Sequence, residues 1–213
     1  MKDKRLSIIA DMVDGRCLAD IGTDHAHLPI ELVKRGKIER AFACDINLGP
    51  LSAAQENIKK SGLSEKITTV LADGLTGISP ADADVIVIAG MGGMTVIDVI
   101  RQWEKQLFNG KQLILQPMKN QPELRKYLLE NGFDILSETA VLDKNHCYTI
   151  MDAAYTGQSS VCDTLFAVCG KHLEQDNAQS RKYIDKQIAR LQKQAVADPE
   201  KLTLIKQIKE KRA

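Results

Sequence analysis

The sequence predicts a doubly wound α/β fold whose parallel sheet ends in an antiparallel hairpin, followed by a small α-helical, coiled-coil-like unit. Three observations predict it. Short apolar runs alternate with helical patterns over the first 150 residues, two consecutive strand-like segments follow, and the remainder shows only helical spacing. Alternation of strand and helix is typical of a parallel sheet with crossover helices.

The predicted strands of the parallel sheet are continuous apolar runs rather than alternating ones, as expected when helices cover both faces. They occupy residues 17–22, 40–45, 67–71, 83–89 and 111–117. The helical patterns between them occupy 28–37, 49–61, 95–108 and 124–130, with proline tolerated in a first turn at Pro29 and Pro50. Strands over 133–141 and 147–155, joined by a polar turn at 142–146, predict the hairpin.

Residues 157–160 (GQSS) predict a boundary, which divides the chain into a ligand-binding domain at 1–157 and a helical domain at 158–213. Beyond it, apolar residues and one histidine recur at helical spacing, with Asp198-Pro199 separating the last two segments. They are Val161, Leu165, Val168, His172, then Ile184, Ile188, Leu191, Ala195, then Leu202, Ile205 and Ile208. Single apolar stripes of this kind predict a helical hairpin.

Composition points to a globular cytoplasmic protein. The 213 residues are 44 % hydrophobic and 27 % charged, and no apolar run approaches the length of a membrane span. The five cysteines lack metal-ligand spacing, so we expect reduced thiols and no zinc site. Residues 1–158 carry 18 Lys and Arg against 21 Asp and Glu, whereas residues 159–213 carry 11 against 7. The basic tail suggests a polyanionic partner, although a solvated helical surface would look the same.

The end of the first predicted strand is the first candidate site. The segment ADIGTDHAH places Asp20, Gly22 and Asp24 where an open α/β sheet binds its ligand. A dinucleotide fingerprint would have three glycines here, and an acid would repel a pyrophosphate. A cofactor that carries a cationic amino acid suits Asp20 better, although Asp20 could simply cap the turn.

Acidic residues also end the next two strands. Asp45, followed by Ile46, is placed to accept hydrogen bonds from both hydroxyls of an adenosine ribose. Asp73 is placed to accept from an adenine amino group, and Gly74 relieves crowding beside it. Three acids at consecutive strand ends indicate a neutral-to-cationic adenosine ligand.

The fourth strand ends in AGMGGM, which brings Ala89, Gly90, Met91, Gly92 and Gly93 close to the predicted crevice. Glycines allow backbone to approach a ligand closely, although a tight turn packed on a helix would also use them. Enzymes that methylate exocyclic amines of nucleic acids usually have Asn or Asp followed by Pro-Pro and an aromatic residue here. Because that motif is absent, a different nucleophile is implied.

These motifs together closely resemble a bacterial family of transfer-RNA methyltransferases. The resemblance covers about residues 1–155 and rests on DIGTDHAHLP, DINLGP, ADG, IAGMGG, LILQP and Leu124-Arg125, with a helical tail of matching length. The family transfers a methyl group from S-adenosylmethionine to N1 of adenine 22, and has a Rossmann-like class I methyltransferase domain followed by a coiled-coil-like domain.

The resemblance implies roles for the candidate residues. Asp24, His25 and the backbone of Gly90 and Met91 would serve the target adenine, and His27, Gly92 and Gly93 would contact the substrate. The cofactor would bind Asp20, Gly22, Asp45, Ile46, Asp73, Gly74, Ala89 and Gly90. Transfer RNA would be the partner of the basic tail through Lys171, Arg181, Lys182, Lys186, Arg190 and Lys193.

Two other functions fit parts of the sequence. A small-molecule methyltransferase of the same fold would use the tail only for dimerisation, and a non-catalytic RNA-binding protein could retain the fold without the activity. The His-x-His pair (His25 and His27) lacks suitably placed acidic or cysteine companions for a metal site, so no metal is expected, and a monomer is favoured.

Overall fold

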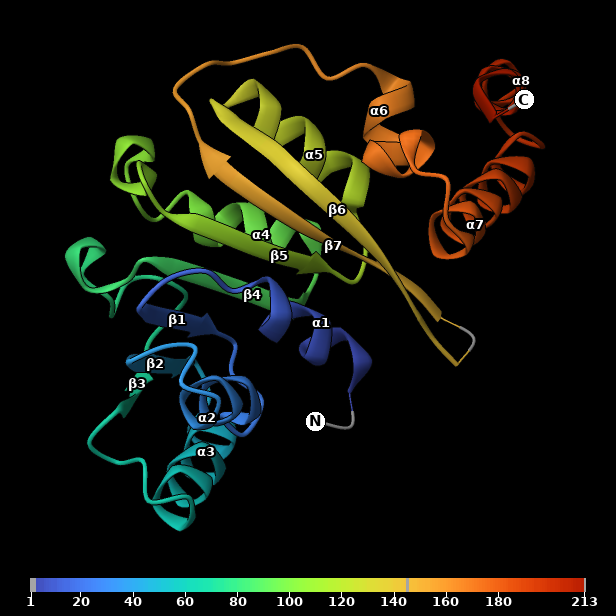
Figure 1. The fold of residues 1–213 in the computed structure, drawn as a ribbon. Coiled ribbons are helices and arrows are strands. Elements are labelled where there is room, and N and C mark those ends of the chain that lie inside the picture. Colours follow the sequence, from blue (N-terminus) through green and yellow to red (C-terminus); the bar gives the residue numbers. More distant parts are fainter. Residues whose placement is uncertain (1–2, 145, 213) are drawn as a thin grey trace.

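The computed structural model describes residues 3–144 and 146–212, and its centre is one seven-stranded sheet (Figure 1). The strand order is β3-β2-β1-β4-β5-β7-β6. The strands are β1 (Cys17–Ile21), β2 (Arg40–Asp45), β3 (Ile67–Leu71), β4 (Val85–Met91), β5 (Gln112–Pro117), β6 (Phe133–Asp143) and β7 (His146–Tyr155). The first five are parallel, whereas β7 runs antiparallel to both β5 and β6. The predicted doubly wound sheet with a terminal hairpin is therefore confirmed.

Helices cover both faces of the sheet. They are α1 (Lys4–Met12), α2 (His27–Lys34), α3 (Leu48–Lys60), α4 (Gly93–Ile100), α5 (Gln121–Glu130), α6 (Thr164–Cys169), α7 (Ala178–Gln194) and α8 (Glu200–Arg212). Short 3₁₀ turns occupy η1 (Pro80–Asp82), η2 (Lys105–Phe108) and η3 (Gly170–Glu174). Apolar residues of α1, α2 and α3 pack on one face, and those of α4 and α5 on the other.

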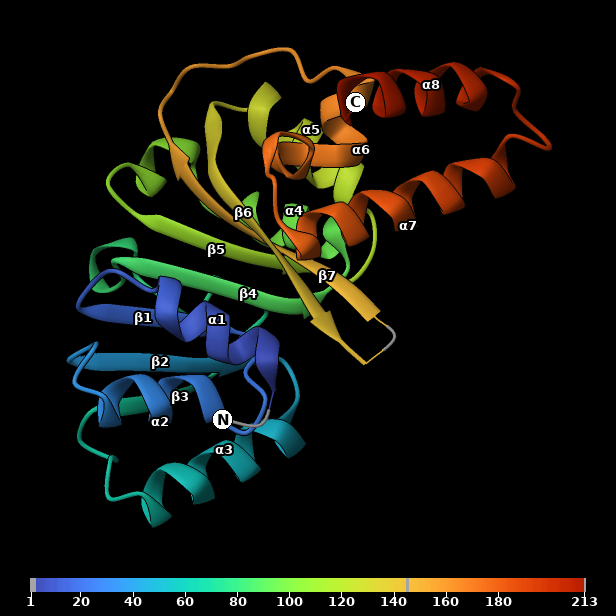
Figure 2. The same cartoon turned by 45° about the vertical axis from the view of Figure 1, so that its right-hand side comes forward.

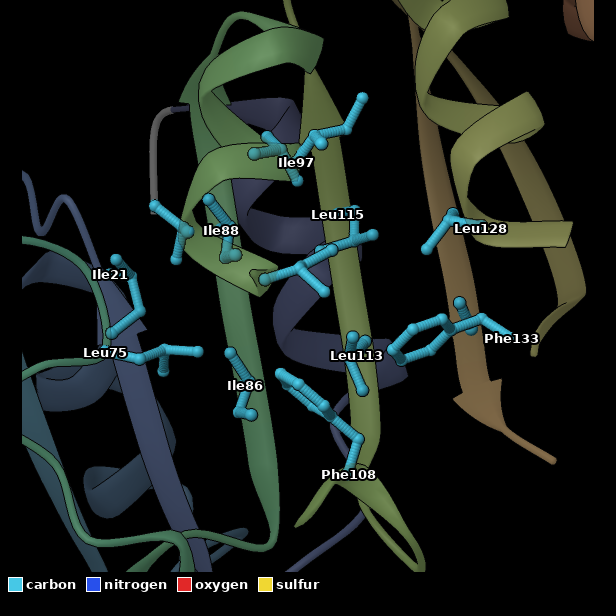
Figure 3. Packing of buried hydrophobic residues seen from close by; sticks show 14 of the residues in the cluster. Ile21, Leu75, Ile86, Ile88, Ile97, Phe108, Leu113, Leu115, Leu128 and Phe133 are labelled. Atoms are coloured by element: carbon cyan, nitrogen blue, oxygen red, sulfur yellow. The ribbon is translucent and has the colours of Figure 1, made fainter. Parts of the chain in front are cut away.

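The two faces are separated by the alternation of side chains along each strand. On β4, Ile86 and Ile88 point to the face of α4 and α5, where they meet Leu113 and Leu115 of β5 (Figure 3). Val85 and Val87 belong to the opposite layer with α1, α2 and α3. Because both faces are covered, β4 is an apolar run with no polar alternation.

The helices from α6 to α8 form a third apolar cluster beside the hairpin. Tyr183, Ile184 and Leu191 of α7 pack with Leu204 and other residues of α8, and α7 and α8 form the helical pair visible in Figure 2. The cluster also includes Ala140 of β6, so these helices share buried surface with the sheet. The predicted helical hairpin is present.

The helix predicted over 95–108 is wrong at its second half. The helix α4 ends at Ile100, and the chain re-forms a 3₁₀ turn only at Lys105–Phe108. In between, the side chain of Gln102 accepts a hydrogen bond from the amide of Leu75 at 2.6 Å, and the indole of Trp103 donates to the Leu75 carbonyl at 3.3 Å. These bonds to a distant loop draw the segment off the helix axis.

Two other boundaries differ from the prediction. The strands of the hairpin extend to Asp143 and His146, which pair with each other, so the turn is shorter than 142–146; its residue Asn145 lies outside the described residues. Val161 was predicted to start a helical stripe, but it precedes α6 and is 91 % exposed. The helix α1, whose N-cap is Asp3, precedes the first predicted strand.

Candidate active site

A cavity opens at the carboxyl ends of β1, β4 and β5. The sheet order reverses between β1 and β4, which is the position where open α/β sheets bind ligands. Five residues predicted from the sequence line this cavity: Asp20, Gly22, Asp24, Ala89 and Gly90. The structure therefore brings the ends of the first and fourth strands together, as the motifs predicted.

Asp20 is the buried acid of the cavity. Its side chain accepts a hydrogen bond from the hydroxyl of Thr23 at 2.6 Å, and the residue is 6 % exposed. Burial, to which the charges of Asp24 and Asp45 add, raises the pKa of Asp20 to about 6, against the effect of Thr23. A carboxylate under such a desolvation penalty gains most from a cationic ligand group.

Gly22 is favoured by its backbone conformation, because its φ of +75° is in the left-handed region. The flexible end of the Met91 side chain lies over it, so that a Cβ atom would be 2.3 Å from the Met91 methyl group. Its amide and that of Thr23 both donate to the carbonyl of Cys44 on β2, at 2.9 and 2.8 Å. The turn after β1 is thus held against the ends of both neighbouring strands.

The loop that follows presents polar side chains at the rim. Asp24 is 76 % exposed and lies 3.5 Å from the imidazole of His25. The rings of His25 and His27 stack with centroids 5.7 Å apart. His25 and Ala26 both have φ near +56°, and the side chain of Asn57 donates to the His25 carbonyl at 3.1 Å, which holds the loop in place.

The glycine loop after β4 lies against the loop after β5. The Met91 carbonyl accepts from the amide of Met118 at 2.7 Å, and the Gly93 amide donates to the Lys119 carbonyl at 2.8 Å. A Cβ atom on Gly93 would lie 2.3 Å from the carbonyl oxygen of Asn120, so backbone approaches too closely for any side chain. Gly90, in contrast, has open space around it.

The other predicted cofactor residues lie at the ends of β2 and β3, outside the lining of this cavity. Asp45 accepts a hydrogen bond from the amide of Asn47 at 2.7 Å, and its own carbonyl accepts from Ala72, next to the exposed Asp73. Ile46 is 61 % exposed. Gly74 has a φ of +60° and packs against the Gln102 side chain. These residues continue the row of strand ends that begins at the cavity.

Sequence reasoning missed three polar residues of the cavity: Asp3, Arg5 and Gln116. Arg5 of α1 donates through Nη1 to the Gln116 side chain at 3.0 Å and through Nη2 to Asp3 at 2.7 Å. Gln116 had a signal in the sequence, since it is a polar residue at the end of an apolar run; the structure shows that it is fully buried. Arg5 had none, because 111 residues separate it from Gln116.

The predicted basic residues of the tail do not form a single group. Lys182, Lys186, Arg190 and Lys193 recur at helical spacing on α7 and are exposed. Arg181 pairs with Asp176. Lys171 lies in η3, half-buried, and its amide donates to Glu138 at 2.7 Å.

Among residues 3–144 and 146–212, no three His, Cys, Asp or Glu side chains are arranged to hold a metal ion. No helix in the same part of the chain combines the length and hydrophobicity needed to cross a membrane.

Comparison with known proteins gives consistent results. A family model described as a methyltransferase domain matches residues 2–151. The tRNA (adenine(22)-N(1))-methyltransferase of Bacillus subtilis is 35 % identical over 164 residues, which cover 73 % of this chain and 69 % of the relative. Streptococcus pneumoniae Sp1610, solved in complex with S-adenosyl-L-methionine, is 32 % identical over the whole of both chains with a TM-score of 0.88. TrmK of M. capricolum, solved with S-adenosyl-homocysteine, is 27 % identical, with a TM-score of 0.82 over 100 % of this chain and 96 % of that one.

The fold, the cavity at the reversal of strand order and the matching domain define the class: a Rossmann-like methyltransferase. Within this class, the chain belongs to the tRNA (adenine(22)-N(1))-methyltransferase family.

Proposed function

We propose that this chain transfers a methyl group from S-adenosylmethionine to N1 of adenine 22 in transfer RNA. The observation that carries the proposal is the buried Asp20 in the cavity between β1 and β4, with Asp45 and Asp73 following at the next strand ends. Membership of the family and the solved relatives with S-adenosyl-L-methionine and S-adenosyl-homocysteine support the same chemistry.

The residues present fit this cofactor. Asp20 is a buried carboxylate with a raised pKa, suited to the ammonium of an amino acid. Gly22, Ala89 and Gly90 keep the cavity wall free of bulk at the ends of β1 and β4. When bound, the cofactor supplies a methyl group on a sulfonium, which is electrophilic without further activation.

Beyond Asp20, the outer strand ends would hold the adenosine half. Asp45 would accept hydrogen bonds from the ribose hydroxyls and Asp73 one from the adenine amine. Ile46 would cover the adenine ring, and Gly74 leaves room beside it.

The protein's work in the chemical step is positioning and charge stabilisation. Neutral adenine already carries a lone pair at N1, so no strong base is required. The positive charge that develops on the base would be stabilised by the carboxylate of Asp24 and by nearby carbonyl dipoles. Gly90 and Met91 offer such carbonyls, although that of Met91 already accepts a hydrogen bond from Met118. His25 and His27 would contact the base or its phosphate.

Transfer RNA would be held by its shape and phosphates. Because N1 lies on the Watson–Crick edge, the target must be unpaired or swung out of its stack. The stripe on α7, formed by Lys182, Lys186, Arg190 and Lys193, would bind phosphates, with Gly92 and Gly93 near the target. Arg181 is a weaker candidate because it pairs with Asp176, and Lys171 is weaker because it is half-buried. We further propose that residues 158–213 act as the RNA-binding unit of a cytoplasmic monomer.

Cofactor affinity is expected to fall as pH decreases through about 6. Burial raises the pKa of Asp20 to about 6, so the ionised form that attracts an ammonium is lost below that value. Calorimetric titration with S-adenosylmethionine at pH 5, 6 and 7.5 measures this dependence. The Asp20→Asn variant serves as the control. It should bind S-adenosylmethionine weakly, with an affinity that does not change between pH 5 and 7.5. If its affinity depended on pH as strongly as that of the unmodified protein, the assignment to Asp20 would be contradicted.

Substituting the α7 stripe is expected to reduce the salt dependence of RNA binding. The slope of log K against log salt is negative, and each lost phosphate contact should reduce its magnitude by about 0.7–0.9. We therefore expect the triple variant Lys182→Ala, Arg190→Ala, Lys193→Ala to reduce the magnitude of the slope by about 2–3. Filter binding of transfer RNA at several salt concentrations measures it. Glu210→Ala, on the exposed surface of α8, is the control, and an identical slope in the triple variant would exclude the stripe from the interface. Substitution is preferable to truncation, which would uncover the buried Glu138.

The function itself is tested by transfer of radiolabelled methyl groups to purified transfer RNA, followed by nucleoside identification. We expect 1-methyladenosine at position 22, and none in a substrate whose adenine 22 is replaced. Methylation of small molecules alone would favour a small-molecule enzyme, and cofactor binding too weak to measure would favour a non-catalytic RNA-binding protein.

A further inference from the structure

Three flat side chains form a stacked column beside the candidate active site. His146 and Tyr148 project from the same side of β7, and their rings stack with centroids 5.8 Å apart and planes at 27°. The guanidinium of Arg5, from α1, lies over the Tyr148 ring with its central carbon 4.9 Å from the centroid. Arg5 also lines the cavity that contains Asp20. The column therefore connects the tip of the hairpin with the cavity.

The charge of Arg5 is already used within the protein. Its Nη2 donates to the Asp3 carboxylate, with which it forms an ion pair at 2.7 Å, and its Nη1 donates to Gln116. A guanidinium neutralised in this way is a poor anchor for a phosphate. Its flat surface, however, is held in place next to Tyr148, and flat cationic groups stack well on nucleobases.

The hairpin carries two different faces near its tip. His146 is exposed and Tyr148 half-buried on one face, whereas Cys147 points to the other. There the helix α7 contacts β7, and burial raises the pKa of Cys147 against the opposing positive charges of Lys186 and Lys182. One face thus offers rings and the other lies near basic groups of α7. Rings for bases and cations for phosphates are the two components of single-stranded RNA binding.

We propose that Arg5, Tyr148 and His146 form a nucleobase-stacking surface for the unpaired nucleotides that accompany the target adenine into the cavity. The proposal rests on the proposed function, because that function requires an adenine removed from its stack. Unstacking costs a few kcal/mol, and stacking of the displaced bases on the protein offsets that cost.

The test compares Tyr148→Leu, Tyr148→Phe and His146→Ala with the unmodified protein. Because His146 is the exposed end of the column, we expect His146→Ala to raise the Kd and KM for transfer RNA about tenfold. Tyr148, stacked by His146 and covered by Arg5, supports the column, so Tyr148→Leu should raise both values by a smaller factor. Tyr148→Phe should keep the affinity of the unmodified protein because it keeps the ring. The salt slope and the affinity for S-adenosylmethionine should not change, since neither a phosphate nor the cofactor is involved.

Controls separate stacking from structural damage. Leu136→Ala, an exposed substitution on β6 outside the column, should leave RNA binding unchanged. The exposed His146→Ala variant keeps the test decisive even where Tyr148→Leu proves poorly folded by circular dichroism. A Kd within about twofold of the unmodified protein for both Tyr148→Leu and His146→Ala would overturn the proposal. So would a loss of affinity accompanied by a reduced salt slope, which indicates lost phosphate contacts.

This proposal and the proposed function fail in different ways. If the protein methylates adenine 22 and both Tyr148→Leu and His146→Ala have normal RNA affinity, the stacking surface is wrong and the function stands. If the protein methylates no transfer RNA but binds an adenine-rich RNA oligonucleotide with an affinity that His146→Ala and Tyr148→Leu both reduce, the function is wrong and the surface stands.

Discussion

Replacing Glu138 by alanine is expected to lower the free energy of unfolding by about 3–5 kcal/mol, as for other buried ion pairs that lose one partner. Glu138 on β6 and Arg125 on α5 are joined at 2.8 Å, and both side chains are fully buried. Burial by itself would lower the pKa of Arg125, but Glu138 and Tyr183 raise it, so the guanidinium stays charged. Without Glu138 a buried cation loses its counter-charge. Chemical denaturation followed by circular dichroism measures the change.

A surface pair provides the matched control. Lys126 and Glu130 lie on the same helix as Arg125, 3.9 Å apart and exposed. Glu130→Ala should therefore change the free energy of unfolding by about 0.5 kcal/mol or less. The double variant Arg125→Met, Glu138→Leu should recover much of the lost stability, because it removes both charges. Equal destabilisation by Glu138→Ala and Glu130→Ala would contradict the assignment.

Replacing Asp24 by alanine is expected to lower kcat about 10²-fold with little change in the affinity for S-adenosylmethionine. Asp24 lines the cavity at its rim, where its carboxylate would meet the positive charge that develops on the adenine. The carboxylate is exposed in the free protein and would lose water contact only when RNA covers the site. Its effect should therefore appear in turnover. Single-turnover methyl transfer with saturating RNA, together with calorimetry, measures the two quantities.

Asp45→Ala is the comparison variant for this experiment. Asp45 lies at the end of β2, outside the cavity that Asp24 lines, and would contact the ribose. We expect it to weaken cofactor binding while turnover at saturating cofactor is largely kept. Equal loss of cofactor affinity in Asp24→Ala and Asp45→Ala would show that the proposed division of roles is wrong.

The sheet was predictable because each strand carries its own signal. Runs such as Val85–Met91 are apolar throughout, and this pattern is typical of strands whose two faces are both buried. The candidate site was predictable to the same extent. In a parallel sheet the carboxyl ends lie along one edge, so acids that follow successive strands must lie near one another.

Other features gave no local signal. The helix α4 ends at Ile100 because Gln102 and Trp103 bond to Leu75, which lies more than 25 residues away in the chain. His172 was predicted as one member of an apolar stripe. In the structure its ring is buried, but both of its nitrogens have polar partners: Nε2 is hydrogen-bonded to the Thr149 hydroxyl at 2.7 Å and Nδ1 to the Ser180 hydroxyl at 3.2 Å. Burial lowers the pKa of His172 to about 4.

The amino-acid sequence alone determined the order of strands and helices, the glycine at the first turn and the acids at the strand ends. Each of these depends on hydrophobic periodicity or on backbone conformation within a few residues. Only the tertiary structure placed Arg5 over Tyr148 beside the cavity, and only it joined Arg125 to Glu138 beneath the helices of the tail. Such contacts depend on distances between chain segments, and those distances are set when the two layers of the core pack around the sheet.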